Sequence, residues 1–312
     1  MRILAGDIGG TKTLLRCVDD GAETLSERYE SNEFETFDDL LRAFVKRIGG
    51  EVHAACFAVA GPVTAGRAKV TNVGWVMEEA ALSRDFSIPH VILINDFTAV
   101  ALGVPLVEAR DRVSLQKGER DPHAPVAILG AGTGLGEAYL TWHHGVHHVI
   151  PSEGGHQDFA PQDEEQTRLF LHLHERYGHV SWERLVSGMG LVNIFTFLGG
   201  EEEVDAAEIA SRASSGDQRA RRAAEIFVDI YGAEAGNMAL RVLARGGVYL
   251  AGGIAAKNID WFTDGRFVEA FCRKGRFRGF NERIPVDVIV DQEVGLRGAL
   301  DLARRITTSD ER

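Results

Sequence analysis

The chain has 312 residues, of which 45% are hydrophobic and 26% are charged, and this is the composition of an ordinary globular protein. At ~150 residues per domain, the length predicts two domains. The 34 basic and 46 acidic residues give a net charge of −12, which argues against a nucleic-acid-binding protein, because such proteins usually present a basic surface.

The first part of the chain alternates between predicted strands and helices. Residues Glu35–Ile48 form an amphipathic pattern that ends at Gly49-Gly50, which predicts a helix. A second helix is predicted to begin near Phe97. Short apolar runs predict strands at Ile3–Ala5, Thr13–Val18, His53–Val59 and Val91–Ile94.

A second block with the same pattern starts near Pro125, where a strand, a glycine-threonine turn and a returning strand follow one another again. We expect the last helix to return to the first domain. The predicted small α/β domain is then residues 1–106 plus 293–312, and the large one is residues 107–292. The predicted elements of this block are Val126–Leu129, Glu137–Trp142, Gln218–Arg245, Val248–Ala251, Val286–Val290 and Gly295–Ile306.

Three glycine-rich turns follow predicted strands, at Gly6–Thr11, Gly130–Gly136 and Gly252-Gly253. Glycine permits close approach of a ligand and a positive φ, and successive backbone N–H groups can bind an anion such as phosphate. Neither the Walker A pattern nor the full dinucleotide-binding fingerprint fits any of them. Each turn alone is equally consistent with a tight β-turn, but three together indicate a phosphate-binding protein.

Two acidic residues stand at the ends of predicted strands. Asp7 lies inside the first turn, where it would repel phosphate unless a cation such as water-bound Mg²⁺ lay between them; the alternative is an Asx-turn. Asp96 follows the fourth strand, a position that suits a general base. A helix N-cap is the alternative, and on this residue alone we favour the cap.

Glu153 and His156 flank a glycine pair. A carboxylate and an imidazole suit the hydroxyls of a polyol, which need both donors and acceptors, whereas a zinc site would need further ligands. Glu183 lies at a predicted helix start with Ser181 as its cap, so it either interacts with the helix dipole or binds a ligand. Four histidines between His143 and His148 predict a surface hairpin.

The three cysteines, Cys17, Cys56 and Cys272, are isolated in the sequence. They form no CxxC pair, so we expect buried thiols in a reducing compartment. There is no apolar signal region near the first residue and no run of the ~18 apolar residues that a membrane span requires. We therefore expect a cytoplasmic protein.

Taken together, these segments resemble the bacterial glucokinases of the hexokinase and actin-like ATPase superfamily. The combination of INDFTA with EGGHQDFAP is specific, whereas the glycine turns alone are not. The C-terminal segment Gly295–Leu300 also fits. The matching stretches are Gly6–Thr11, Thr71–Trp75, Leu93–Val100, Gly130–Gly136, Glu153–Pro161, Ser187–Asn193 and Leu250–Ile254.

The resemblance implies two ribonuclease H-like α/β domains with ATP in a cleft between them, and ATP with Mg²⁺ as cofactors. It implies a kinase that phosphorylates glucose at the 6-hydroxyl, with Asp96 as the general base. It also implies that the protein is a homodimer. Implied sugar ligands are Asn95, Asp96, Glu153, His156 and Glu183. Implied nucleotide ligands are Gly6, Asp7, Gly9, Gly10, Thr11, Gly132, Thr133, Gly134, Gly252 and Gly253, with Asp7 on magnesium through water and the last two near adenosine.

The sequence departs from the family at several positions. Lys12-Thr13 replaces a frequent Asn-Ala, and Ser152 replaces a glycine. Gly61-Pro62 is closer to the repressor and kinase family of sugar kinases. That sister family binds zinc through a nearby cysteine cluster, which is missing after His156, so zinc is not expected.

These departures leave the exact hexose open, and mannose, fructose or an amino sugar is the nearest alternative. An actin-like ATPase without a sugar acceptor is a second alternative. A sugar-responsive repressor is not expected, because the first predicted strand begins at once and no helix-turn-helix segment precedes it.

Overall fold

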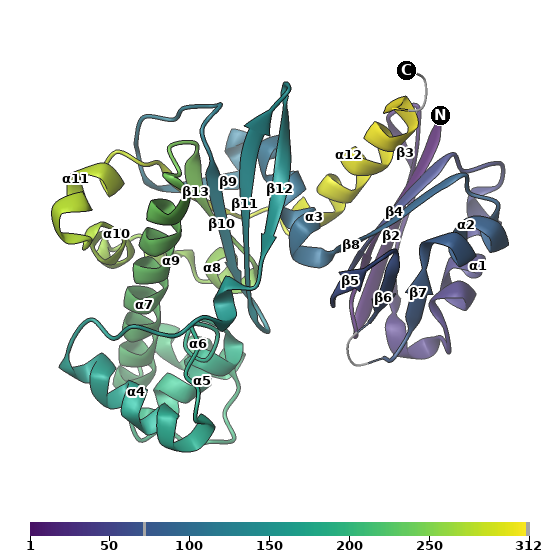
Figure 1. Ribbon diagram of the computed structural model, residues 1–312. Helices are drawn as coiled ribbons and strands as arrows, with labels where there is room; N and C mark the ends of the chain where they lie inside the picture. The colour runs from purple at the N-terminus through teal and green to yellow at the C-terminus, as the bar shows by residue number, and fades with distance from the viewer. Residues whose placement is uncertain (71–72, 310–312) are drawn as a thin grey trace. The chain divides into compact units, whose positions relative to one another are not determined.

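The computed structural model describes residues 1–70 and 73–309, and it divides the chain into two compact units (Figure 1). The first unit contains Met1–Val107 and the chain from Glu293 onward. The second unit is Glu108–Gln292. Thr71 and Asn72, which begin one of the family-like stretches, lie outside the described residues.

The first unit is built on a five-stranded sheet with the order β3-β2-β1-β4-β8. β1, β4 and β8 run parallel, while β2 and β3 form antiparallel hairpins beside β1. The strands are β1 (Arg2–Ile8), β2 (Lys12–Asp19), β3 (Ala22–Glu30), β4 (Ala54–Val59) and β8 (His90–Asn95), and a separate three-stranded sheet contains β5 (Val63–Thr64), β6 (Arg67–Lys69) and β7 (Val76–Glu78).

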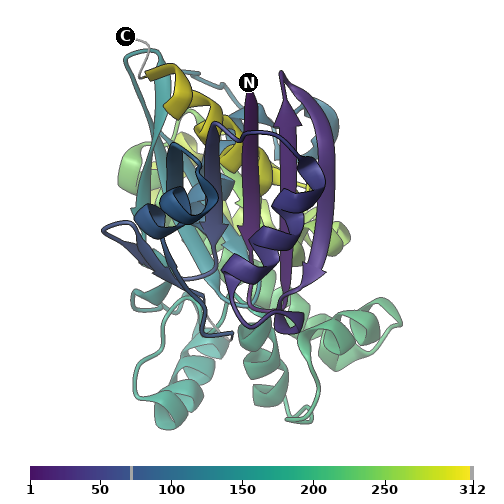
Figure 2. The ribbon, with the colours of Figure 1, turned by 90° about the vertical axis from the view of Figure 1, so that its right-hand side faces the viewer.

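Helices cover both faces of this sheet, because successive strand residues alternate between the faces. On one face Leu4 packs with Phe37 and Phe44, and on the other Ile3 packs with Leu296. In Figure 2, α1 accordingly lies in front of the sheet and α12 behind it. The helical segments are η1 (Ser31–Glu33), α1 (Phe37–Ile48), α2 (Glu79–Phe86), α3 (Asp96–Gly103), η2 (Val104–Leu106) and α12 (Val294–Ser309).

The second unit is built on a six-stranded sheet with the order β12-β11-β10-β13-β14-β9. β10, β13 and β14 are parallel, and the other strands pair antiparallel. The strands are β9 (Arg112–Gln116), β10 (Val126–Ala131), β11 (Leu135–His143), β12 (Val146–Ser152), β13 (Gly247–Ala251) and β14 (Val286–Ile289).

The long helix α7 forms the centre of the second unit's core (Figure 1). Its Tyr231 is fully buried, and its hydroxyl accepts a hydrogen bond from the Ala131 N–H at the end of β10 (3.1 Å). The helical segments are η3 (Ala109–Asp111), η4 (Gly154–His156), α4 (Glu164–Tyr177), α5 (Gly188–Phe197), α6 (Ala206–Ser214), α7 (Gln218–Val242), α8 (Gly253–Lys257), α9 (Ile259–Phe262), α10 (Arg266–Cys272), η5 (Gly275–Phe277) and α11 (Arg278–Asn281).

The predicted strands and the long helices are confirmed to within a few residues. The histidine segment is the predicted hairpin, with a tight turn at His144-Gly145 where both residues have positive φ. All three cysteines are buried, as expected. Among the described residues, no helix combines the length and the low polarity that crossing a membrane would require.

Candidate functional site

In the first unit, the parallel strands bring two of the predicted segments to one edge of the sheet. Ile8 of β1 is in register with Val59 of β4, and Val59 is in register with Asn95 of β8. The residues that follow β1 and β8 therefore leave the sheet at the same edge. These are the turn that begins at Gly9 and the helix that begins at Asp96.

A serine outside all the predicted motifs holds the first turn. Ser31 is fully buried, and its hydroxyl donates to the Gly9 carbonyl (2.8 Å) and lies 3.0 Å from the Thr13 hydroxyl. Its backbone N–H donates to the Thr11 carbonyl (2.8 Å). Sequence analysis missed Ser31, because it lies some twenty residues from the turn that it supports and no local pattern marks it.

Asn95, rather than Asp96, is the cap of α3, so the predicted Asp96 cap is wrong. The Asn95 Oδ1 accepts from the backbone N–H groups of Phe97 (2.9 Å) and Thr98 (3.2 Å). Its Nδ2 donates to the Gly61 carbonyl (3.2 Å) and to Asp96 Oδ1 (2.9 Å). Asn95 therefore both starts the helix and orients the neighbouring carboxylate.

Asp96 is the first residue of α3, and its Oδ1 also accepts from the Phe97 N–H (2.8 Å). Asp7 lies near it at the same sheet edge, with a solvent-accessible side chain. Even so, desolvation by the surrounding protein and then the charge of Asp96 raise the pKa of Asp7 to about 6. Two carboxylates that disfavour each other's charge favour a bound cation, so the residues fit a magnesium ion held through water.

In the second unit, β10 and β13 run parallel, with Gly130 in register with Ala251. The turn after β10 and the Gly252-Gly253 pair after β13 therefore share one edge. Gly252 has φ 86°, and a Cβ there would lie 2.6 Å from the Ala131 carbonyl oxygen, so only glycine fits. The Cβ position of Gly132, by contrast, faces open space, and Thr133 is exposed.

Glu153 and His156 belong to a short turn around η4. The Gly154 N–H donates to the Ser152 hydroxyl (3.0 Å), and the His156 N–H donates to the Glu153 carbonyl (3.0 Å). Ser152, which departs from the family pattern, thus supports this turn. The side chains of Glu153 and His156 are 88% and 61% exposed and are therefore available to a ligand.

Glu183 joins this group. Its Oε1 lies 3.8 Å from the His156 Nδ1, and its own N–H donates to the Gly155 carbonyl (2.8 Å). The predicted helix start at Ser181 is wrong, because α5 begins only at Gly188 with Ser187 as its cap. Glu183 lies in the turn before that helix, so the helix-dipole interpretation no longer applies to it.

A buried carboxyl group that sequence analysis missed lies against the same turn. Glu137 of β11 is 2% exposed, and a Cβ on Gly154 would clash with its Oε2. Burial and the charge of Glu234 raise the pKa of Glu137 to about 8, and Arg241 opposes that shift. Neither Glu137 oxygen has a hydrogen-bond partner among the described residues. Gly154 must be glycine for this packing to exist.

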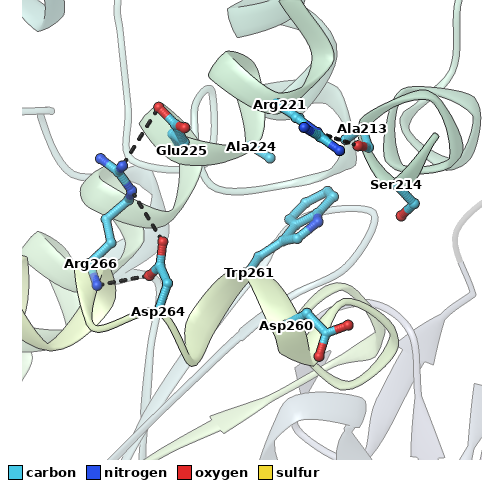
Figure 3. A pocket seen from close by; sticks show the side chains of 9 residues that line it. All are labelled: Ala213, Ser214, Arg221, Ala224, Glu225, Asp260, Trp261, Asp264 and Arg266. Atoms are coloured by element: carbon cyan, nitrogen blue, oxygen red, sulfur yellow. Dashed lines mark hydrogen bonds and ion pairs between the residues drawn. The ribbon is translucent and has the colours of Figure 1, made fainter. Parts of the chain in front are cut away.

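The second unit also contains a pocket of about 440 Å³ that includes none of these residues. Figure 3 shows the Trp261 ring projecting toward Arg221, whose Nε donates to the Ala213 carbonyl (3.0 Å). Arg266 pairs with Glu225 (3.6 Å) and with Asp264 (3.7 Å) (Figure 3). Because Arg266 is already paired with two carboxylates and the pocket includes none of the turns that share a sheet edge, it is a weaker candidate site than the glycine turns.

Comparison with known proteins identifies the family of the chain. A family model described as Glucokinase matches residues 4–306. The glucokinase of Nostoc sp. (strain PCC 7120) is 40% identical, over 97% of this chain and 99% of that protein. The glucokinase of Tolumonas auensis is 35% identical, over 96% and 95%.

Solved structures give the same result. A glucokinase from an Antarctic psychrotroph is 29% identical, with a TM-score of 0.87 over 97% of this chain and 99% of that one. The glucokinase of Balamuthia mandrillaris, solved in complex with glucose, is 25% identical, with a TM-score of 0.83 over 97% and 93%. The α/β fold is that of the actin-like ATPases, as predicted, and the chain belongs to the glucokinase family.

Proposed function

We propose that this protein transfers the γ-phosphoryl group of ATP to the 6-hydroxyl of glucose, giving glucose 6-phosphate and ADP. Membership of the glucokinase family supports this activity. The observation that carries the proposal is the position of the Asp96 carboxylate, on the first residue after β8. The carboxylate is oriented by Asn95 and Phe97, and it leaves the sheet at the same edge as the Gly9–Thr11 turn.

Asp96 is the proposed general base. A sugar hydroxyl is a poor nucleophile at neutral pH, so Asp96 would accept its proton as the oxygen bonds to the γ-phosphorus. The bond from phosphorus to the bridging oxygen breaks at the same time, and ADP leaves with that electron pair. The two donors on Asp96 Oδ1 fix the carboxylate in one orientation.

The phosphate ligands proposed in the first unit are the backbone groups of Gly9, Gly10 and Thr11, with Gly6 shaping the strand that leads to them. Those in the second unit are Gly132, Thr133 and Gly134, with Gly252 and Gly253 near the adenosine. Magnesium, when bound, neutralises charge on the phosphates, and Asp7 would hold it through water. Positioning and charge stabilisation would supply most of the rate enhancement.

The sugar ligands proposed in the second unit are Glu153, His156 and Glu183, which the turn around η4 gathers. Asn95 and Asp96 are the sugar ligands proposed in the first unit. Because each carboxylate or imidazole pairs with a hydroxyl, a sugar with an inverted or missing hydroxyl would leave a polar group unpaired. We also propose that the protein is a homodimer in the cytoplasm. Analytical ultracentrifugation tests the oligomeric state.

Coupled ADP release measured with glucose, mannose, fructose and N-acetylglucosamine tests the proposal. We expect the highest kcat/KM with glucose. A higher value with another hexose would change the substrate but keep the kinase. ADP release that no sugar stimulates would favour an ATPase without a sugar acceptor.

A further inference from the structure

Glu183 contacts two segments of the second unit that sequence analysis treated as independent. Its N–H donates to the Gly155 carbonyl in the turn that carries His156. Its side-chain Oε2 accepts a hydrogen bond from the Leu135 N–H (3.1 Å), at the end of the glycine-rich turn after β10. One residue thus joins the proposed sugar turn to the proposed phosphate turn.

The Glu183 carboxylate is also fitted closely to the phosphate turn. A Cβ on Gly134 would lie 2.5 Å from Glu183 Oε2, so the glycine leaves room for this oxygen. Further along the chain, the Ser187 hydroxyl donates to the Glu183 carbonyl (2.7 Å) and the Gly188 N–H donates to the Gly132 carbonyl (2.8 Å). The segment from Glu183 to Gly188 therefore holds the turn at two points.

The two oxygens of the carboxylate face different groups. Oε2 is engaged by the Leu135 N–H, whereas Oε1 lies 3.8 Å from the His156 Nδ1 on the sugar side. The side chain of Glu183 is 24% exposed to solvent. An ionised carboxylate has enough lone pairs to serve both sides at once.

We propose that Glu183 has a second role, as the positioning residue of the phosphate turn, and that it shares one carboxylate between the sugar and the Leu135 N–H. This inference rests on the proposed sugar-binding function. A sugar hydroxyl that donates to Oε1 fixes the plane of the carboxylate and with it the Leu135 N–H and the turn. Sugar and nucleotide then favour each other's binding by the same factor, as linkage requires.

Glu183→Gln separates the two roles, because an amide has a single acceptor oxygen. The Leu135 N–H and the proposed sugar face different oxygens of Glu183, so glutamine can place its one acceptor oxygen toward only one of them. Gly134→Ala perturbs the same carboxylate from the phosphate turn, because the added Cβ would displace Glu183 Oε2. All the proposed sugar ligands remain unchanged in this variant. Glu153→Gln is the matched control, since Glu153 belongs to the sugar turn and its side chain is 88% exposed.

The experiment measures dissociation constants of the full chain by titration calorimetry, for glucose alone and for the ATP analogue AMPPNP with and without saturating glucose. We expect glucose to tighten AMPPNP binding by about fivefold or more in the unchanged protein, the low end of ordinary coupling. In Glu183→Gln this factor should fall to near one, while in Glu153→Gln it should persist once glucose is saturating. In Gly134→Ala, glucose affinity should fall by severalfold.

The outcomes distinguish the positioning role of Glu183 from the proposed sugar-binding function on which it rests. Weakened glucose binding with an unchanged coupling factor in Glu183→Gln would overturn the positioning role and leave the sugar role intact. Unchanged glucose affinity in that variant would remove the sugar role itself. A Gly134→Ala protein that melts normally and binds glucose as tightly as the unchanged protein would also overturn the shared carboxylate.

Discussion

Asp7 of β1 and Asp96, the first residue of α3, lie at the same edge of the first sheet, and the charge of Asp96 affects the ionisation of Asp7. Desolvation and the charge of Asp96 together raise the pKa of Asp7 to about 6. The proposed base and the proposed magnesium ligand are therefore electrostatically linked before any substrate binds. A cation near Asp7 would relieve this repulsion and favour the ionised form of Asp7.

Replacing the proposed base should separate chemistry from binding. In Asp96→Ala, we expect kcat to fall by about 10²–10⁴, the usual contribution of a general base. Calorimetry should still detect glucose binding, because the proposed ligands of the second unit remain. Asp85→Ala, which removes a surface carboxylate of the same unit, should keep normal kinetics. Near-normal turnover in Asp96→Ala would exclude the role.

Asp7→Asn tests the metal. The variant keeps the shape of the side chain but loses the charge that would hold a hydrated cation. We expect the Mg²⁺ concentration for half-maximal activity to rise by about tenfold, while glucose affinity measured without nucleotide stays the same. An unchanged magnesium titration would contradict the assignment. Stoichiometric zinc that is lost together with activity on chelation would contradict the choice of metal.

Glu137→Gln tests the buried carboxyl group under Gly154. The pKa of Glu137 is raised from 4.5 to about 8 in the folded protein. A raised carboxyl pKa gives stability that is complete below the unfolded pKa and is lost as the pH rises through the folded pKa. The unchanged protein should therefore lose stability between about pH 5 and pH 9, and the variant should lose less.

The measurement for Glu137 is the free energy of unfolding in urea at pH 5, 7 and 9. At pH 9 we expect Glu137→Gln to exceed the unchanged protein by about 1–3 kcal/mol, because glutamine cannot ionise. Glu119→Gln, at an exposed position, should leave the pH dependence as it was. A variant that is less stable at every pH by the same amount would show that Glu137 is ionised throughout, as the partner of Arg241.

Gly298→Ala tests the packing that holds the helix of the proposed base. Gly298 of α12 lies against α3, and a Cβ there would clash with the backbone carbonyl oxygen of Ala99. Because backbone cannot move aside easily, we expect a loss of about 1–3 kcal/mol in stability and a lower kcat. At Gly295, three residues earlier, the nearest atom to a Cβ is the Val100 Cγ2 at 3.5 Å, an ordinary contact.

Gly295→Ala is therefore the matched control on the same helix. It should leave the melting temperature unchanged or raise it slightly, since alanine is a better helix former than glycine and Gly295 lies in the first turn of α12. The melting temperature and kcat are measured for both variants and compared with those of the unchanged protein. Equal stability of the two proteins would show that the crossing of α3 and α12 can relax.

Features that depend on neighbouring residues can be predicted from the amino-acid sequence. The strand, glycine turn and returning strand were predicted near Asp7 and near Gly132, because alternating apolar residues and turn glycines act over a few positions. The histidine hairpin and the ends of the long helices could be predicted for the same reason, because local residue patterns define them. The family resemblance rested on such short segments as well, and comparison with known proteins confirmed it.

Which of these features lie against one another depends on the packing of segments that are far apart in the chain. Asn95 and Asp96 are both good caps, and Asn95 fills the position because its Oδ1 accepts from the first helical N–H groups. Its Nδ2 bond to the Gly61 carbonyl, from a distant segment, holds it there. Ser181 and Ser187 both precede turns that could start a helix, and α5 begins after Ser187, where the Gly188 N–H reaches the Gly132 carbonyl. Ser31, Glu137 and the second contact of Glu183 depend on segments distant in the chain, and no local pattern encodes a distance between such segments.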